Sequence, residues 1–366
     1  MAPLLLCRSI VGDDVGSNDF GWHDELPGRG NRVSLTPAMD SLAMGGVRLG
    51  SFYTFKLCSP SRSMIMTGRY TFQFGYYDNI DADGPNGGVP LTYSMLPADL
   101  KRAGYATHAA GSKQPLPGSQ ITNLPGGCWR TLQLAGSAET GRCCGAEWHC
   151  GYRTKAQVPT SRGFDTWLGY FHAEENYYTH LFGGEVECGP VCGNKACCGV
   201  DFTEGSKPGE LRPYPGLAHN GTQVVDGAET PLYSTYLYIG RALELIEERN
   251  QSQPFFLYLP LQNVHGPTES PQRFKDMFPD HGTMNGYRLK IMACMSAMDE
   301  GVANLTKALR ANGMWENTVL FFQADVSTAS TQGALSFCAI ARIPNAMSGG
   351  DDAFRTAATW VAVALE

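Results

Sequence analysis

The feature that most constrains the fold of this chain is the alternation of short apolar strands with amphipathic helices. An apolar run near the N-terminus predicts a first buried strand that ends just before Asp13. The expected helices cover residues 37–44, 96–103, 233–248 and 287–310, and the expected strands cover 47–54, 105–110, 255–261 and 319–323. Helices that alternate with apolar strands favour an α/β fold, a three-layer sandwich in which helices cover both faces of a mostly parallel central sheet.

Polar residues follow three of the expected strands at the point where each strand ends. Asp13 and Asp14 follow the first strand, Asp325 follows the strand 319–323, and His265 follows the strand 255–261 by a few residues. The carboxyl ends of parallel strands meet at one edge of a sheet, where ligands bind, so these side chains are expected to converge. Paired carboxylates suit a hard divalent cation such as calcium or magnesium. A helix cap or turn is the alternative use of the pair Asp13-Asp14.

The run Cys-Ser-Pro-Ser-Arg-Ser-Met-Ile-Met-Thr-Gly-Arg-Tyr at 58–70 places a thiol directly before a proline-initiated turn of helix. Pro60 suits the first helical position, where its missing N–H is harmless. The free amides that follow would point at a bound anion, and Arg62 lies one turn further on. These residues predict an anion site with a modifiable residue at its mouth. The alternative is that Cys58 is a small buried apolar residue or half of a disulfide.

The segment 58–70 resembles the sulfatase signature Cys-x-Pro-Ser-Arg, and Thr67-Gly68-Arg69 matches the second half of that signature at the right spacing. The resemblance covers most of the chain and is strongest to the arylsulfatase branch that includes arylsulfatase B. Further segments that resemble the family are 13–19, 36–43, 162–170, 177–180 and 262–267. The resemblance implies an alkaline-phosphatase-like fold and a sulfuric ester hydrolase that cleaves aryl or glycan sulfates.

The resemblance also implies the roles of individual residues. Cys58 would be oxidised to formylglycine by a formylglycine-generating enzyme, and its hydrate would attack sulfur with one oxygen and expel the sulfate with the other. Asp13, Asp14, Asp325 and the modified Cys58 would hold a calcium ion. Arg62 would steady the hydrate, His149 would orient it, and His265 would bind the sulfate or assist departure of the alcohol. For either histidine alone, an ordinary core or surface position is the alternative.

Two further functions stay open at the level of sequence. One is hydrolysis of a phosphate or phosphonate ester on the same scaffold. The other is a catalytically impaired sulfatase-like protein that binds sulfated glycans, and it is motivated by departures from the family pattern. Where the family has Gly-Lys-Trp-His, with a lysine that binds sulfate, Gly111 is followed by Ser112 and the pattern resumes only at Trp148-His149.

Residues 112–147 are therefore expected to be a foreign, disordered insertion within a catalytic domain 1–325. They lack apolar periodicity, and the codons for their two ends can carry splice-donor and splice-acceptor sequences. We interpret the segment as translated from a retained intron, with a genuine loop insertion as the alternative. After Asp325 the family has an asparagine that binds the cation, whereas this chain has Val326. Residues 326–366 carry no family motif and are expected to be a non-family tail, so that the smaller C-terminal domain is missing.

Composition restricts the classes of binding partner and the cellular compartment that are expected for this chain. The 366 residues include 28 lysines and arginines against 35 aspartates and glutamates, an acidic balance that argues against a nucleic-acid or membrane-surface role. No segment is apolar enough to suggest a membrane span. Twelve cysteines and three Asn-x-Ser/Thr sequons, at Asn220, Asn250 and Asn304, favour the secretory pathway, and the family is lysosomal or extracellular. Disulfides are favoured over a zinc site for the cysteines at 188–198. The N-terminal apolar run is too short for a signal peptide.

Overall fold

The central element of the fold is a nine-stranded sheet. The computed structural model describes residues 6–16, 19–23, 34–49, 52–75, 77–80, 88–109, 148–151, 154–171, 175–178, 180, 203–210, 212–213, 223–225, 228–230, 233–278, 286–326 and 339–342. In these residues the strand order is β2-β11-β10-β1-β9-β3-β4-β5-β6, and β7 and β8 form a separate hairpin. The strands are β1 (Leu6–Gly12), β2 (Val47–Arg48), β3 (Ala106–Ala109), β4 (Thr166–Gly169), β5 (Thr203–Gly205), β6 (Arg212–Pro213), β7 (Gln223–Val225), β8 (Ala228–Thr230), β9 (Phe255–Leu261), β10 (Thr318–Ala324) and β11 (Ala339–Arg342).

The five strands at the centre of the sheet, β10-β1-β9-β3-β4, are all parallel to their neighbours. The strands at both edges pair antiparallel. Every residue of β9 is buried, as expected for a strand that is covered on both faces. Gly12 at the end of β1 lies opposite Ala324 of β10 and Leu261 of β9, so these three strands end at the same level.

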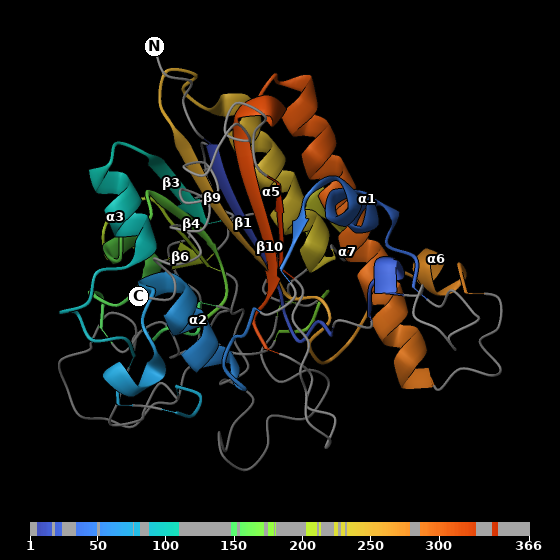
Figure 1. Ribbon diagram of the computed structural model, residues 1–366, viewed down its shortest axis with the longest axis horizontal. Helices are drawn as coiled ribbons and strands as arrows, with labels where there is room; N and C mark the ends of the chain where they lie inside the picture. Colours follow the sequence, from blue (N-terminus) through green and yellow to red (C-terminus); the bar gives the residue numbers. More distant parts are fainter. Residues whose placement is uncertain are drawn as a thin grey trace.

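Helices cover the two faces of the sheet and complete a three-layer α/β sandwich (Figure 1). The helices are α1 (Pro37–Gly45), α2 (Cys58–Thr67), α3 (Leu96–Arg102), α5 (Ser234–Glu248), α6 (Gln272–Lys275) and α7 (Gly286–Ala311). Figure 1 shows α1, α5 and α7 on one side of the sheet and α2 and α3 on the other. The buried face of α7 carries the expected apolar residues, among them Ile291, Val302 and Leu309.

The expected helices and strands are confirmed, with differences at two places. The strand predicted over 47–54 is too long, because β2 has only two residues and lies at the edge of the sheet, where it pairs with the short strand β11. Helix α2 begins at Cys58 rather than at Pro60, because Leu57 closes the first turn by accepting a hydrogen bond from the Ser61 amide at 3.1 Å. Pro60 still lies in the first turn, where a helix leaves its N–H groups without intrahelical partners.

Several expectations fall on residues outside the described part of the chain. These are the insertion at 112–147, the cysteines at 188–198, Asn220 and most of the tail. Within the tail, the four residues of β11 are described, and they extend the sheet beside β10. Among the described helices, none combines the length and apolar character that crossing a membrane requires.

Candidate active site

Asp13 and Asp325 meet where the neighbouring parallel strands β1 and β10 end. The Asp325 amide donates to the Gly12 carbonyl at 3.1 Å, which ties the two strand ends together. On the other side, the Asp13 amide donates to the Asn263 carbonyl at 2.8 Å, and the Val264 amide donates to the Asp13 carbonyl at 2.6 Å. The backbone therefore fixes the position of each carboxylate, as the convergence of strand ends predicts.

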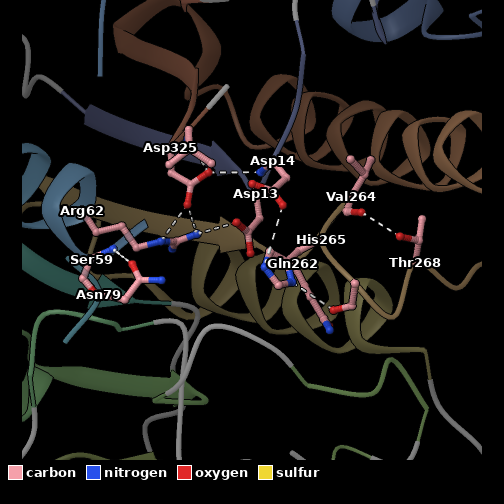
Figure 2. Close-up of polar contacts among 12 residues, drawn as sticks. Asp13, Asp14, Ser59, Arg62, Asn79, Gln262, Val264, His265, Thr268 and Asp325 are labelled. Carbon is pink, nitrogen blue, oxygen red and sulfur yellow. Dashed lines mark hydrogen bonds and ion pairs between the residues drawn. The ribbon is translucent and has the colours of Figure 1, made fainter. Parts of the chain in front are cut away.

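Arg62 links the two carboxylates from the opposite side of the site (Figure 2). Its Nε and Nη2 atoms donate to Oδ2 of Asp325 at 3.0 and 2.8 Å, and Nη2 lies 3.5 Å from Oδ1 of Asp13. All three side chains are 0 % exposed. A buried carboxylate without a nearby cation is costly, so the guanidinium stabilises the pair in the folded chain.

The second oxygen of Asp325 accepts two backbone hydrogen bonds. They come from the Asp14 amide at 3.1 Å and from the Val326 amide at 2.7 Å. A carboxylate has about four lone-pair positions, and together with the two hydrogen bonds from Arg62 these contacts fill them and fix the orientation of Asp325.

Cys58 completes a compact group with the two aspartates. One ligand atom each from Asp13, Cys58 and Asp325 lies within 4.8 Å of the others, and all three residues are buried. Cys58 is the first residue of α2, and the Ser59 amide beside it donates to the Asn79 side chain at 3.3 Å. The arrangement puts a nucleophilic position at a helix N-terminus, next to two carboxylates and a guanidinium.

His265 and Asp14 form the more open side of the site. Nε2 of His265 lies 3.8 Å from Oδ2 of Asp14, and the two side chains are 19 % and 30 % exposed. The Tyr177 hydroxyl donates to the carbonyls of Gln262 and His265, at 3.0 and 3.1 Å, and so holds the turn after β9. Burial, with contributions from the neighbouring Cys294 and Tyr233, raises the pKa of Tyr177 well above its ordinary value, so the hydroxyl keeps its proton.

His149 lies on a separate segment. It is buried and has a left-handed backbone, with φ 42°. Its neighbours anchor it, since the Trp148 amide donates to the Tyr170 carbonyl and the Cys150 carbonyl accepts from Val89. The described contacts join Asp13, Asp14, Cys58, Arg62, His265 and Asp325 into one cluster. The role of His149 stays a prediction.

Sequence reasoning missed three residues that support the site. Asn79 accepts from the first turn of α2, Tyr177 fixes the turn before His265, and the Asn263 carbonyl positions Asp13. Tyr177 and Asn263 lie within segments that resemble the family, but their contacts join positions up to 250 residues apart. Only the folded chain shows which group each residue holds.

Comparison with known proteins identifies the family of this chain. A family model described as sulfatase matches residues 9–128 and 132–337. The chain belongs to the sulfatase family. That match spans the predicted insertion except residues 129–131, and it extends into the predicted tail as far as residue 337, so the domain boundaries stay predictions.

Named relatives are identical to this chain at somewhat more than a quarter of the aligned residues. Mouse arylsulfatase J is 28 % identical over 324 residues, which cover 88 % of this chain and 43 % of the relative. Bovine arylsulfatase A is 28 % identical over 319 residues, which cover 86 % of this chain and 50 % of the relative. The chain therefore spans about half the length of the curated relatives it matches.

Solved structures support the fold assignment. The crystal structure of Ps i-CgsB has a TM-score of 0.66 and 22 % identity, with 93 % of this chain and 66 % of that chain covered. The structure of BT4656 in complex with its substrate, D-glucosamine-2-N,6-O-disulfate, has a TM-score of 0.56 and 15 % identity, with 93 % and 71 % covered. These likenesses show the alkaline-phosphatase-like fold of sulfatases in this chain.

Proposed function

We propose that this protein is a sulfuric ester hydrolase that acts through a formylglycine derived from Cys58. The observation that carries the proposal is the convergence of Asp13, Asp325 and Arg62 on Cys58 at the start of α2. Family membership supports sulfate esters as the substrate class. The hydrated aldehyde would supply two hydroxyls on one carbon, one to attack sulfur and one to release the sulfate.

The donor set fits a divalent cation best when Cys58 is modified. Two buried carboxylates and a thiol within 4.8 Å combine hard and soft ligands, whereas two carboxylates and a hydrate offer oxygen alone. Asp13, Asp325 and the modified Cys58 would hold a calcium ion, with Asp14 beside them. The cation would neutralise charge on the sulfate oxygens.

The chain's other polar groups have distinct tasks in this proposal. Arg62, already within hydrogen-bond reach of Asp325, would donate to the hydrate and hold it in one orientation. His265 is partly exposed and lies beside Asp14, so it can reach a substrate at the mouth of the site and give a proton to the departing alcohol. His149 would orient the hydrate, as the family resemblance implies.

Substrate, partners and compartment follow from the same family reasoning. We propose a sulfated small molecule or glycan as substrate and a formylglycine-generating enzyme as the partner that modifies Cys58. A secretory, lysosomal or extracellular location is proposed because that enzyme must meet the chain. Among the described sequon residues, Asn250 and Asn304 are exposed, which suits glycosylation.

The test combines mass spectrometry of the Cys58 peptide with an assay of sulfate-ester hydrolysis. The full chain is produced with and without formylglycine-generating enzyme, and the peptide that contains Cys58 is examined for conversion of its thiol to an aldehyde. The modified protein should hydrolyse an aryl sulfate faster than the matching aryl phosphate, and Cys58→Ala should abolish the sulfate reaction. Turnover of the phosphate alone, or full activity in Cys58→Ala, would overturn the proposal.

One observation favours the second candidate function, a catalytically impaired protein that binds sulfated glycans. Val326 is buried directly after Asp325, at the position where the family has an asparagine ligand, and its side chain offers no oxygen. Loss of one cation ligand lowers affinity for the metal. Binding of a sulfated glycan by modified protein that shows no turnover would favour this second function.

A further inference from the structure

Three exposed aromatic side chains follow the signature helix in the sequence. Tyr70, Phe72 and Tyr77, here called the aromatic strip, are 46 %, 61 % and 54 % exposed. The rings of Tyr70 and Phe72 are stacked, with centroids 5.7 Å apart and an interplanar angle of 13°. Contiguous exposed apolar surface marks binding sites more often than singly exposed side chains do, and the stacked pair Tyr70 and Phe72 is contiguous.

The segment that carries the aromatic strip leads from the end of α2 back to the start of that helix, beside the candidate active site. Tyr70 and Phe72 follow the C-terminal end of α2, a helix of ten residues and therefore about 15 Å long. The chain then returns to the helix N-terminus, where Asn79 accepts from the Ser59 amide at 3.3 Å and the Ile80 amide donates to the Ser59 hydroxyl at 2.9 Å.

The inner end of the strip lies beside the segment that leads into α2. The Tyr77 ring centroid is 6.4 Å from that of Phe55, three residues before Cys58. A ligand anchored at Cys58 that extends along α2 therefore meets Tyr77 first and the stacked pair Tyr70 and Phe72 last. The length of the helix accommodates more than one sugar ring.

The chemistry of the strip suits sugar rings. A pyranose has an apolar C–H face that packs on an aromatic ring while its hydroxyls stay in water. Tyrosine and phenylalanine supply such surfaces at low entropic cost, because each has only two side-chain torsions. Phe72 contributes no hydroxyl, so its exposed ring provides apolar contact alone.

Two basic side chains near the strip favour binding of sugars that carry a negative charge. Arg69 and Lys56 are exposed, one at each end of α2. The Arg69 guanidinium lies 5.3 Å from the centroid of the Tyr93 ring and 3.3 Å from the Gln73 side-chain oxygen, which holds it close to the stacked pair. Asp78, beside Tyr77, disfavours a sulfate there, so the sulfates of neighbouring sugars fit best at Arg69 and Lys56.

We propose that the aromatic strip binds sugar residues of an extended sulfated glycan beyond the sulfated residue at Cys58. The proposal deepens and rests on the proposed function, because it names a chain of several sugars as the substrate class. It makes affinity depend on chain length, since a monosaccharide sulfate reaches Cys58 without touching Tyr70 or Phe72.

A binding measurement tests this proposal independently of catalysis. Isothermal titration calorimetry is carried out on the full chain with Cys58→Ser, which cannot turn over the ligand. The probes are a chondroitin 6-sulfate hexasaccharide and N-acetylgalactosamine 6-sulfate. Adding Tyr70→Ala and Phe72→Ala should weaken hexasaccharide binding about tenfold and leave monosaccharide binding unchanged. Tyr287→Ala, which removes an equally exposed ring on α7, is the matched control and should change neither.

Four outcomes would overturn the proposal, and the first three concern binding. They are an unchanged affinity for the hexasaccharide in the double variant, an equal loss for both probes, and the same loss in Tyr287→Ala. A fourth is concentration-dependent association of the wild-type chain in size-exclusion chromatography that the double variant abolishes, since the strip would then bind a second copy. Failure of the proposed function is seen separately, as absent turnover of aryl sulfate by the modified protein.

Discussion

Arg62 shows how one side chain can hold a site together before any ligand binds. Its guanidinium donates twice to Asp325 and lies 3.5 Å from Asp13, and none of the three side chains is exposed to water. Removing one member of such a group leaves buried charge uncompensated, which costs far more than loss of a surface pair.

Arg62→Ala should therefore destabilise the protein strongly. We expect the free energy of unfolding at neutral pH to fall by about 3–5 kcal/mol, because two carboxylates lose their cation in a buried site. Chemical denaturation measures the change. Arg69→Ala is the matched control, since Arg69 belongs to the same signature but is exposed, and it should stay within about 0.5 kcal/mol. A similar small effect for both variants would contradict the structural role of Arg62.

At the level of elements, α7 supports the loop that carries Asp13 and Asp14. Arg288 pairs with Asp19, whose other carboxylate oxygen accepts from the Gly16 amide at 2.8 Å. Asp299 of α7 accepts from the amides of Ala38 and Met39, at 3.0 and 2.8 Å, and so caps the N-terminus of α1. A carboxylate in this position stabilises the helix start.

Asp299 should make the free energy of unfolding depend on pH. Burial, together with a smaller effect of the charge of Asp40, raises its pKa to about 6, against the lowering effect of the two backbone hydrogen bonds. The folded state then binds a proton more readily than the unfolded state. The contribution of Asp299 to the free energy of unfolding is therefore greatest below pH 4 and declines as pH rises through about 6.

Asp299→Asn isolates this contribution. The free energy of unfolding of the wild-type chain, minus that of the variant, should decrease as pH is raised from 4 to 7, because asparagine does not titrate. Denaturation curves at several pH values give the difference. If the two pH profiles are parallel, their constant offset reflects only the altered cap, and the titration of Asp299 is refuted.

At the level of the whole molecule, residues distant in sequence form one ligand set. Asp13 follows β1, Asp325 follows β10, and Cys58 begins α2, yet their ligand atoms lie within 4.8 Å. A ligand bound by all three can form its contacts only in the folded state. Binding therefore stabilises the fold as a unit, by an amount set by ligand concentration relative to Kd.

Calcium should accordingly raise the stability of the modified protein. At a free calcium concentration of 100 times Kd we expect a gain of about 2.7 kcal/mol, which Asp13→Asn should remove. Val326→Asn adds an oxygen ligand beside Asp325, so it should lower Kd for calcium. Scanning calorimetry with and without calcium measures these gains. Absence of any calcium effect, in protein whose formylglycine is verified by mass spectrometry, would count against the cation site.

Sequence periodicity and the signature at 58–70 were sufficient to predict the fold class, the family and the central strands other than β4. Periodicity is local, because burial on one face repeats every 3.6 residues in a helix and every two in a strand. The positions of Asp13, Asp325 and His265 were predictable to the level of a shared sheet edge, since parallel strands end together.

The tertiary structure alone decided which groups touch. Arg62 pairs with Asp325, and the Tyr177 hydroxyl donates to the His265 carbonyl. Asn79 accepts a hydrogen bond from the start of α2. No local sequence pattern predicts these contacts. The start of α2 at Cys58 likewise depended on how Leu57 closes the first turn. Side-chain contacts depend on how distant segments pack, and packing is a property of the whole folded chain.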